Sequence, residues 1–186
     1  MSTYFVRELM VPLSEYATVP AGSTLFDAVL ALEKAQEEFD QTKYRHRAVL
    51  ILDADEQVVG KLSQTDVLVA LEPQYEDLDA TGELLRYGFS TSFVRDMRKQ
   101  RRLRAKPLKD ICGKATKLKV EDFMQAPSEG EFIDEDASLE IAILQLVMGQ
   151  HFSLLVTRDK KITGILRLTD VFGAVYHIMK ACENIL

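Results

Sequence analysis

Two short segments of the chain place an aspartate three residues after a hydroxyl or a cation, at the expected start of a helix. They are Ser63-Gln64-Thr65-Asp66 and Arg167-Leu168-Thr169-Asp170. The exposed N–H groups and positive dipole end of a helix start favour anions. An aspartate offers two acceptors to the hydroxyls of a ribose. Both segments are therefore candidates for binding a nucleoside phosphate.

Each segment also has an interpretation that needs no ligand. Ser63 and Asp66 have the spacing of a capping box, which stabilises a helix start by about 1 kcal/mol. We favour ligand binding at this turn because the pattern recurs in the second half of the chain. Arg167 stands where a hydroxyl is expected, so it either grips phosphate oxygens or pairs with Asp170 and blocks the pocket. The sequence leaves these two alternatives for Arg167 equal.

The elements that must position these segments occur twice. The segment from Val6 to Pro12 is echoed from Val120 to Pro127, with Met10 and Met124 at equivalent places. An apolar stripe with helical spacing follows in each copy, namely Leu25, Ala28, Val29 and Leu32, then Leu139, Ala142, Ile143 and Leu146. The first copy holds extra residues, which fit between Glu33 and Tyr44.

Short apolar runs then predict two strands and a closing helix in each copy. The strands are expected at 48–52 and 57–62 and again at 153–156 and 161–166, and the helices at 67–71 and 171–179. The predicted order is strand, helix, strand, strand, helix, in duplicate, and the second closing helix is the longer. The fold class is α/β (α+β).

This order, the Met10 and Met124 patterns and the paired Asp66 and Asp170 turns resemble a tandem pair of CBS domains, over residues 3–72 and 117–182. The resemblance is to a freestanding regulatory pair of the bacterial, Bateman-module type. It implies two β-α-β-β-α units packed through their sheets with pseudo-twofold symmetry, and usually a homodimer. It also implies an adenosine nucleotide (AMP, ADP or ATP) as regulatory ligand, with no obligatory cofactor and no catalysis.

The resemblance implies a set of ligand-binding residues in each copy. They are Thr18, Arg47, Ala48, Ser63, Thr65 and Asp66 in the first copy, and Ile133, His151, Ser153, Arg167, Thr169 and Asp170 in the second. His46 and His151 occupy matching places before the second strand of each copy. For both histidines we favour a strand cap at the surface over contact with a phosphate.

Several function classes are disfavoured by what the sequence lacks. It has no Gly-x-Ser-x-Gly, Gly-x-Gly-x-x-Gly, Gly-x-x-x-x-Gly-Lys-Ser/Thr or His-Glu-x-x-His pattern, so we expect a regulatory module and no enzyme. Cys112 and Cys182 lack metal-ligand spacing, so no metal site is expected. Without an apolar run of membrane length or a signal-peptide pattern, the expected location is cytoplasmic and no membrane contact is predicted.

A basic insert separates the two copies at residues 73–116. Eleven lysines and arginines and only two aspartates lie from Arg95 to Lys119, although the chain's net charge is -6. A helix is predicted from about Ser92 to Arg104. The alternative function is a ligand-free dimerisation or docking module that acts through this insert. Nucleic acid is disfavoured as a partner because no aromatic residue lies between Phe93 and Phe123.

Overall fold

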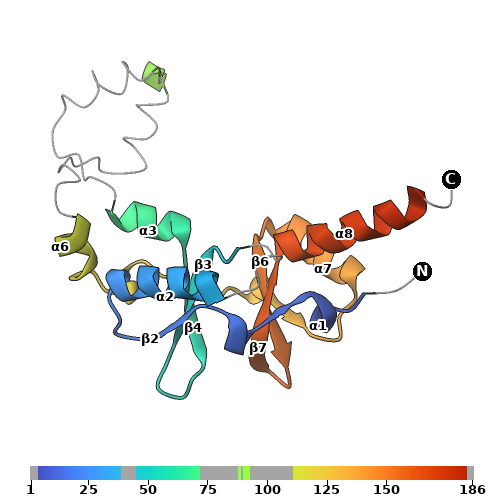
Figure 1. The fold of residues 1–186 in the computed structure, drawn as a ribbon, viewed down its shortest axis with the longest axis horizontal. Coiled ribbons are helices and arrows are strands. Elements are labelled where there is room, and N and C mark those ends of the chain that lie inside the picture. The colour runs from blue at the N-terminus through green and yellow to red at the C-terminus, as the bar shows by residue number, and fades with distance from the viewer. Residues whose placement is uncertain (1–3, 39–44, 72–87, 89, 93–110, 184–186) are drawn as a thin grey trace.

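The chain folds into two α/β units that lie side by side, as a computed structural model describes for residues 4–38, 45–71, 88, 90–92 and 111–183 (Figure 1). The first unit contains β2 (Thr18–Pro20), α2 (Leu25–Glu38), β3 (Ala48–Leu52), β4 (Val58–Ser63) and α3 (Gln64–Leu71). The second contains β5 (Phe132–Asp134), α7 (Leu139–Gly149), β6 (Ser153–Arg158), β7 (Lys161–Arg167) and α8 (Leu168–Glu183). The predicted order of elements and the α/β class are confirmed.

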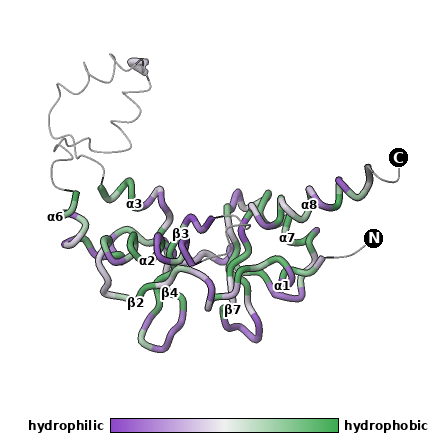
Figure 2. The backbone as a smooth tube through the Cα atoms, viewed as in Figure 1, coloured by the Kyte–Doolittle hydropathy of each residue, from purple (hydrophilic) through white to green (hydrophobic). Residues whose placement is uncertain are grey.

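Each unit builds its sheet in the same way. In the first unit β2 pairs in parallel with β3, and β3 pairs antiparallel with β4. In the second unit β5 pairs in parallel with β6, and β6 pairs antiparallel with β7. The two hairpin tips consist mostly of hydrophilic residues and extend away from the helices (Figure 2). The expected pseudo-twofold relation of the units stays a prediction.

Each unit is completed by the segment that precedes the other unit in the sequence. The helix α1 (Val6–Leu9) and strand β1 (Val11–Pro12) lie against the second unit, where β1 pairs antiparallel with β7 (Figure 1). Val6 is fully buried in the core of that unit. Conversely, α6 (Ile111–Ala115) and the 3-10 helix η3 (Val120–Asp122) lie against the first unit, and Val120 is buried in its core. The exchange ties the two units together.

Among the described residues, three buried apolar clusters stabilise this arrangement. One fills each unit behind its helices, and together they bury six of the eight residues of the predicted helical stripes, namely Leu25, Ala28, Leu32, Leu139, Ala142 and Leu146. The other two, Val29 and Ile143, are half-buried. A third cluster lies between the sheets, where Leu50 of β3 and Leu155 of β6 are buried with Val11, Tyr16 and Ile165. Burial of such side chains contributes about 1.5 to 3 kcal/mol each. The units therefore pack through their sheets, as predicted.

The insert between the units is the part of the fold that the structure describes least. The helix predicted from about Ser92 to Arg104 lies almost entirely outside the described residues, as does most of the basic stretch. The predicted unit boundaries also stay predictions. Within the described part of the chain, no helix combines the length and apolar character needed to cross a membrane.

Candidate functional site

A cavity of about 550 Å³ opens between the two units. Its wall contains nine of the predicted ligand-binding residues: Arg47, Ala48, Ser63, Thr65, Asp66, His151, Ser153, Arg167 and Thr169. Three predicted residues lie outside the wall. Thr18 is half-buried in β2, Ile133 is buried in the second core, and Asp170 is held behind Arg167. The wall also contains residues that sequence reasoning did not assign to the site: Tyr16, Arg45, Lys61, Gln64, Gln125, Glu131, Gln150, Phe152 and Leu168.

The turn from β4 into α3 forms one wall of the cavity and has the geometry of a capping box. The amide N and the Oγ of Ser63 donate hydrogen bonds to Oδ2 of Asp66, at 2.8 and 2.5 Å. The Asp66 amide N donates to Ser63 Oγ at 3.2 Å. Asp66 Oδ1 accepts a hydrogen bond of 2.8 Å from Nε2 of Gln125. Both carboxylate oxygens therefore have partners within the chain, and a ribose would compete with Gln125 for Oδ1.

The equivalent turn of the second unit is closed by an ion pair. Arg167 donates from Nε to Oδ2 of Asp170 and from Nη2 to Oδ1, both at 2.6 Å. Only 5% of Arg167 is exposed. Of the two roles that the sequence allowed for Arg167, the structure has the pairing with Asp170. The two turns consequently differ: Asp66 lines the cavity, whereas Asp170 does not.

Below Arg167 lies a buried group of polar and aromatic side chains. His46 is fully buried, its Nδ1 is 3.3 Å from Nη1 of Arg167, and its ring meets that of Tyr16 edge-on with centroids 4.4 Å apart. Burial, followed by the charge of Arg167, lowers the pKa of His46 to about 4. Burial raises the pKa of Tyr16 to about 12. The expectation that His46 lies at the surface is wrong, because Tyr16 and Arg167 enclose it. His151, at the matching place in the second unit, is half-buried and lines the cavity.

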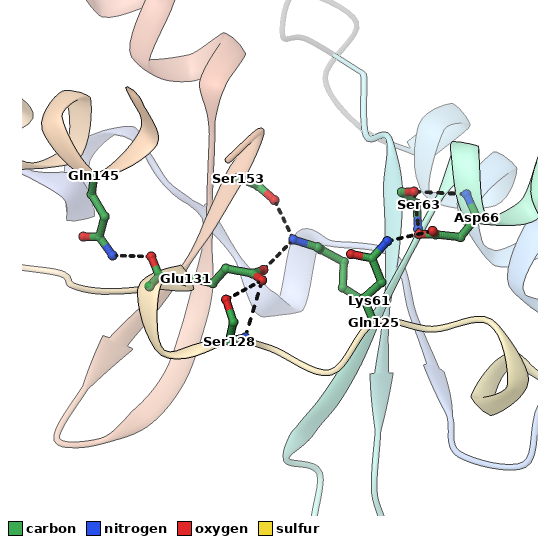
Figure 3. A network of polar contacts seen from close by, with 9 residues as sticks. Lys61, Ser63, Asp66, Gln125, Ser128, Glu131, Gln145 and Ser153 are labelled. Carbon is green, nitrogen blue, oxygen red and sulfur yellow. Dashed lines mark hydrogen bonds and ion pairs between the residues drawn. The ribbon is translucent and has the colours of Figure 1, made fainter. Parts of the chain in front are cut away.

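An ion pair between the units crosses the cavity wall (Figure 3). Nζ of Lys61, on β4, lies 2.8 Å from Oε2 of Glu131 and 3.5 Å from Oγ of Ser153. The glutamate closes a capping box on the 3-10 helix η4 (Glu129–Glu131), in which Ser128 Oγ donates to Glu131 Oε1 at 3.0 Å. Burial raises the pKa of Glu131, but the hydrogen bond and charge of Lys61 and the bonds from Ser128 outweigh it, so the pKa lies below its usual value.

Cationic and apolar groups share the remaining wall. Arg45 and Arg47 are exposed at its rim, and Phe152 is 80% exposed there. The cavity can thus offer an apolar face to a flat ring, acceptors to hydroxyl groups and cations to an anion. Among the residues that the structure describes, no three histidine, cysteine, aspartate or glutamate side chains are grouped to hold a metal ion.

A family model for the CBS domain matches residues 6–73 and 120–177, which together make up more than half of the chain. The chain therefore belongs to the CBS-domain family and contains a tandem pair of these domains. Among curated proteins, no sequence matches the chain.

Solved structures of CBS-pair proteins share this fold over nearly the whole chain. CBSX2 from Arabidopsis thaliana is 20% identical, with a TM-score of 0.59 and coverage of 96% of this chain and 99% of that one. A structure of CBSX2 in complex with AMP is 19% identical, with a TM-score of 0.58 and coverage of 94% and 98%. A CBS domain-containing protein from Bacillus anthracis is 17% identical, with a TM-score of 0.58 and coverage of 94% of both chains.

Proposed function

We propose that the cavity between the units binds an adenosine-containing nucleotide (AMP, ADP or ATP), and that the protein signals its presence to a partner protein by a change of shape. The observation that carries this proposal is the composition of the cavity wall, which joins the Asp66 turn with cations and an exposed aromatic ring from both units. Membership of the CBS family supports it, as does the AMP complex of a CBS pair with the same fold.

The wall suggests how each part of such a ligand is held. The ribose hydroxyls bind Asp66 in exchange for Gln125, while the phosphate lies at the N-terminus of α3 within reach of Arg47 and His151. The base lies against Ala48 and stacks on Phe152. Because these groups come from both units, a ligand that binds them all favours one relative position of the units over others. This differential binding is the basis of the proposed signal.

The proposed functional form is a homodimer. A dimer is expected to cover apolar residues of the two closing helices, namely Val67, Leu68, Leu71, Val171, Phe172 and Val175, and of these Leu68 on α3 and Phe172 on α8 are 68% and 67% exposed. Val171 is instead buried in the second core. Exposed apolar side chains on helix faces are typical of surfaces that bind another copy of the chain.

The first prediction tests the nucleotide site through Asp66. A hydrogen bond to a charged group contributes about 1.5 to 3 kcal/mol, so Asp66→Ala should weaken nucleotide binding by roughly 10- to 100-fold. Isothermal titration calorimetry with adenosine, AMP and ATP measures this. Asp27→Ala is the matched control, because Asp27 accepts the same capping bonds from Thr24 at the start of α2 and does not line the cavity. If wild type, Asp66→Ala and Asp27→Ala bind nucleotide with equal affinity, Asp66 serves only to cap the helix.

The alternative is a ligand-free dimerisation or docking module that acts through the basic insert. It is favoured by the internal partners of both Asp66 oxygens, which leave the turn satisfied without a ligand. Heating the purified protein and separating the supernatant on a nucleotide-resolving column distinguishes the two. Release of a nucleotide supports the sensor. If folded protein releases none and gives no calorimetric response to any of the three ligands, the docking module is the better account.

A further inference from the structure

The ion pair between Lys61 and Glu131 is unusual in its position, since it joins the two units inside the cavity. Lys61 comes from the middle of β4 in the first unit, while Glu131 precedes β5 of the second unit. The side chains are only 18% and 14% exposed. Both residues also line the cavity, so a bound ligand meets them directly. Charges that are mostly shielded from water interact more strongly with a ligand than exposed charges do.

The carboxylate of Glu131 is held in place by contacts other than Lys61. The Oγ and amide N of Ser128 donate to its Oε1, at 3.0 and 3.4 Å. The turn that carries it is fixed to α7, because Gln145 Nε2 donates to the carbonyl oxygens of Gly130 and Phe132, at 2.8 and 2.7 Å. Figure 3 shows Gln145 reaching this turn beside Glu131. Glu131 therefore stays at the cavity wall as a negative charge when a ligand binds.

Lys61 is able to serve a ligand and Glu131 together. Its ammonium group has three donors. Its polar contacts within the described part of the chain are the 2.8 Å bond to Glu131 and the longer 3.5 Å contact with Ser153. An anion in the cavity can replace the weak serine contact while the glutamate bond remains. Each additional negative charge on the ligand, however, is repelled by the fixed glutamate.

We propose that Lys61 and Glu131 set the charge selectivity of the cavity: Lys61 donates a hydrogen bond to the phosphate of the ligand, and Glu131 disfavours ligands of higher negative charge. This inference rests on the proposed function and names two residues that control which nucleotide the cavity prefers. The charge of Glu131 thus favours a monophosphate over a triphosphate.

The test compares ligands that differ only in phosphate. Calorimetry gives the dissociation constants of adenosine, AMP and ATP for wild type, Lys61→Met, Lys61→Arg and Glu131→Gln. Lys61→Met should weaken AMP binding by about 10-fold or more and leave adenosine binding unchanged, because one charged hydrogen bond to the phosphate is lost. Lys61→Arg should restore most of the AMP affinity. Glu131→Gln keeps an oxygen that can accept from Ser128 and removes the negative charge, so it should increase the affinity for ATP more than the affinity for AMP.

Matched controls separate the site from general charge effects. Lys34→Met removes a lysine that is 74% exposed on α2 and pairs with Glu38, and Glu129→Gln removes an exposed carboxylate beside Glu131. Both controls should bind all three ligands as wild type does. Circular dichroism and thermal unfolding establish that each variant is folded. If Lys61→Met does not fold, Lys61→Arg and Glu131→Gln carry the test.

The possible results distinguish this inference from the function on which it rests. Wild type that binds none of the three ligands overturns both. If wild type binds the ligands and Lys61→Met weakens adenosine binding as much as AMP binding, the nucleotide site is supported and Lys61 has a structural role only. An unchanged ratio of ATP to AMP affinity in Glu131→Gln likewise overturns the selectivity assigned to Glu131.

Discussion

At the scale of single residues, equivalent positions in the two units have acquired different neighbours. Asp66 lies three residues after Ser63 and takes part in a helix cap at the cavity wall. Asp170 lies three residues after Arg167, whose guanidinium group donates to both of its carboxylate oxygens. Replacing a hydroxyl by a guanidinium therefore converts an open turn into a closed one. A single substitution between copies makes the candidate site asymmetric, although the backbone pattern of the two turns is the same.

The second prediction concerns His46 and the pH dependence of stability. Its pKa of about 4 in the fold lies below the value near 6.5 of an unfolded chain, so between these pH values the unfolded state binds more protons. The free energy of unfolding should consequently fall as pH drops from about 6.5 to about 4, by at most about 3 kcal/mol, and this contribution should level off below pH 4. Arg167, Asp170 and Tyr16 are among the charged or titratable groups that face the ring.

Urea unfolding of wild type and His46→Gln across this pH range measures the effect. The difference in unfolding free energy between the two proteins should narrow as the pH falls, because the glutamine does not titrate. His177→Gln, at an exposed position on α8, is the matched histidine-to-glutamine control. Parallel curves for wild type and His46→Gln would show that protonation of His46 is not linked to folding.

The residues of the candidate site were only partly predictable. The Asp66 turn could be found because its residues are neighbours in sequence and the motif recurs. Lys61 carried a weaker signal: alternation along β4 puts Lys61 and Ser63 on the face opposite buried Leu62. Nothing in local spacing joins Lys61 to Glu131, Gln125 to Asp66 or His46 to Arg167, because each contact links segments that are far apart in the chain.

At the scale of elements, periodicity predicted the helices and strands well. The stripes that define α2 and α7 are consequences of which side chains face the core, so they can be counted in the sequence. The exchange of the opening segments between units has no such local signal. The repeat identifies the segments around Met10 and Met124 as equivalent, but it does not say that each one packs on the other copy's unit.

The third prediction compares two equivalent glycines at which the exchanged segments approach the sheets. A Cβ at Gly164 would lie 2.5 Å from the backbone oxygen of Val11 and 3.3 Å from Cα of Pro12, whereas a Cβ at Gly60 would meet the flexible side chain of Met124. A backbone neighbour cannot turn aside, so Gly164→Ala should cost about 2 to 3 kcal/mol of unfolding free energy and Gly60→Ala distinctly less. Chemical denaturation of both variants measures the difference. Equal losses would mean that β1 moves as easily as a methionine side chain.

At the scale of the whole molecule, the second unit carries apolar side chains that its own fold does not cover. On α7, Ile141, Leu144 and Met148 are 50%, 57% and 77% exposed. Phe172, Tyr176 and Met179 of α8 are 67%, 53% and 65% exposed. Each trio has the spacing that places side chains on one helix face. Because α7 also holds the turn of Glu131 through Gln145, a partner on these helices would lie close to the cavity.

The fourth prediction is that these helix faces are covered in a homodimer. Light scattering should give twice the 21.1 kDa mass of the chain at micromolar concentration. Changing both Phe172 and Met179 to glutamate should yield monomers, since two charges would have to be buried without partners. Ile111→Glu is the control, because Ile111 is 44% exposed but lies on α6, against the first unit. The Ile111→Glu protein should remain a dimer. A mass near 21.1 kDa at every concentration of wild type would refute the dimer, and a dimeric Phe172→Glu, Met179→Glu protein would place the interface on another surface.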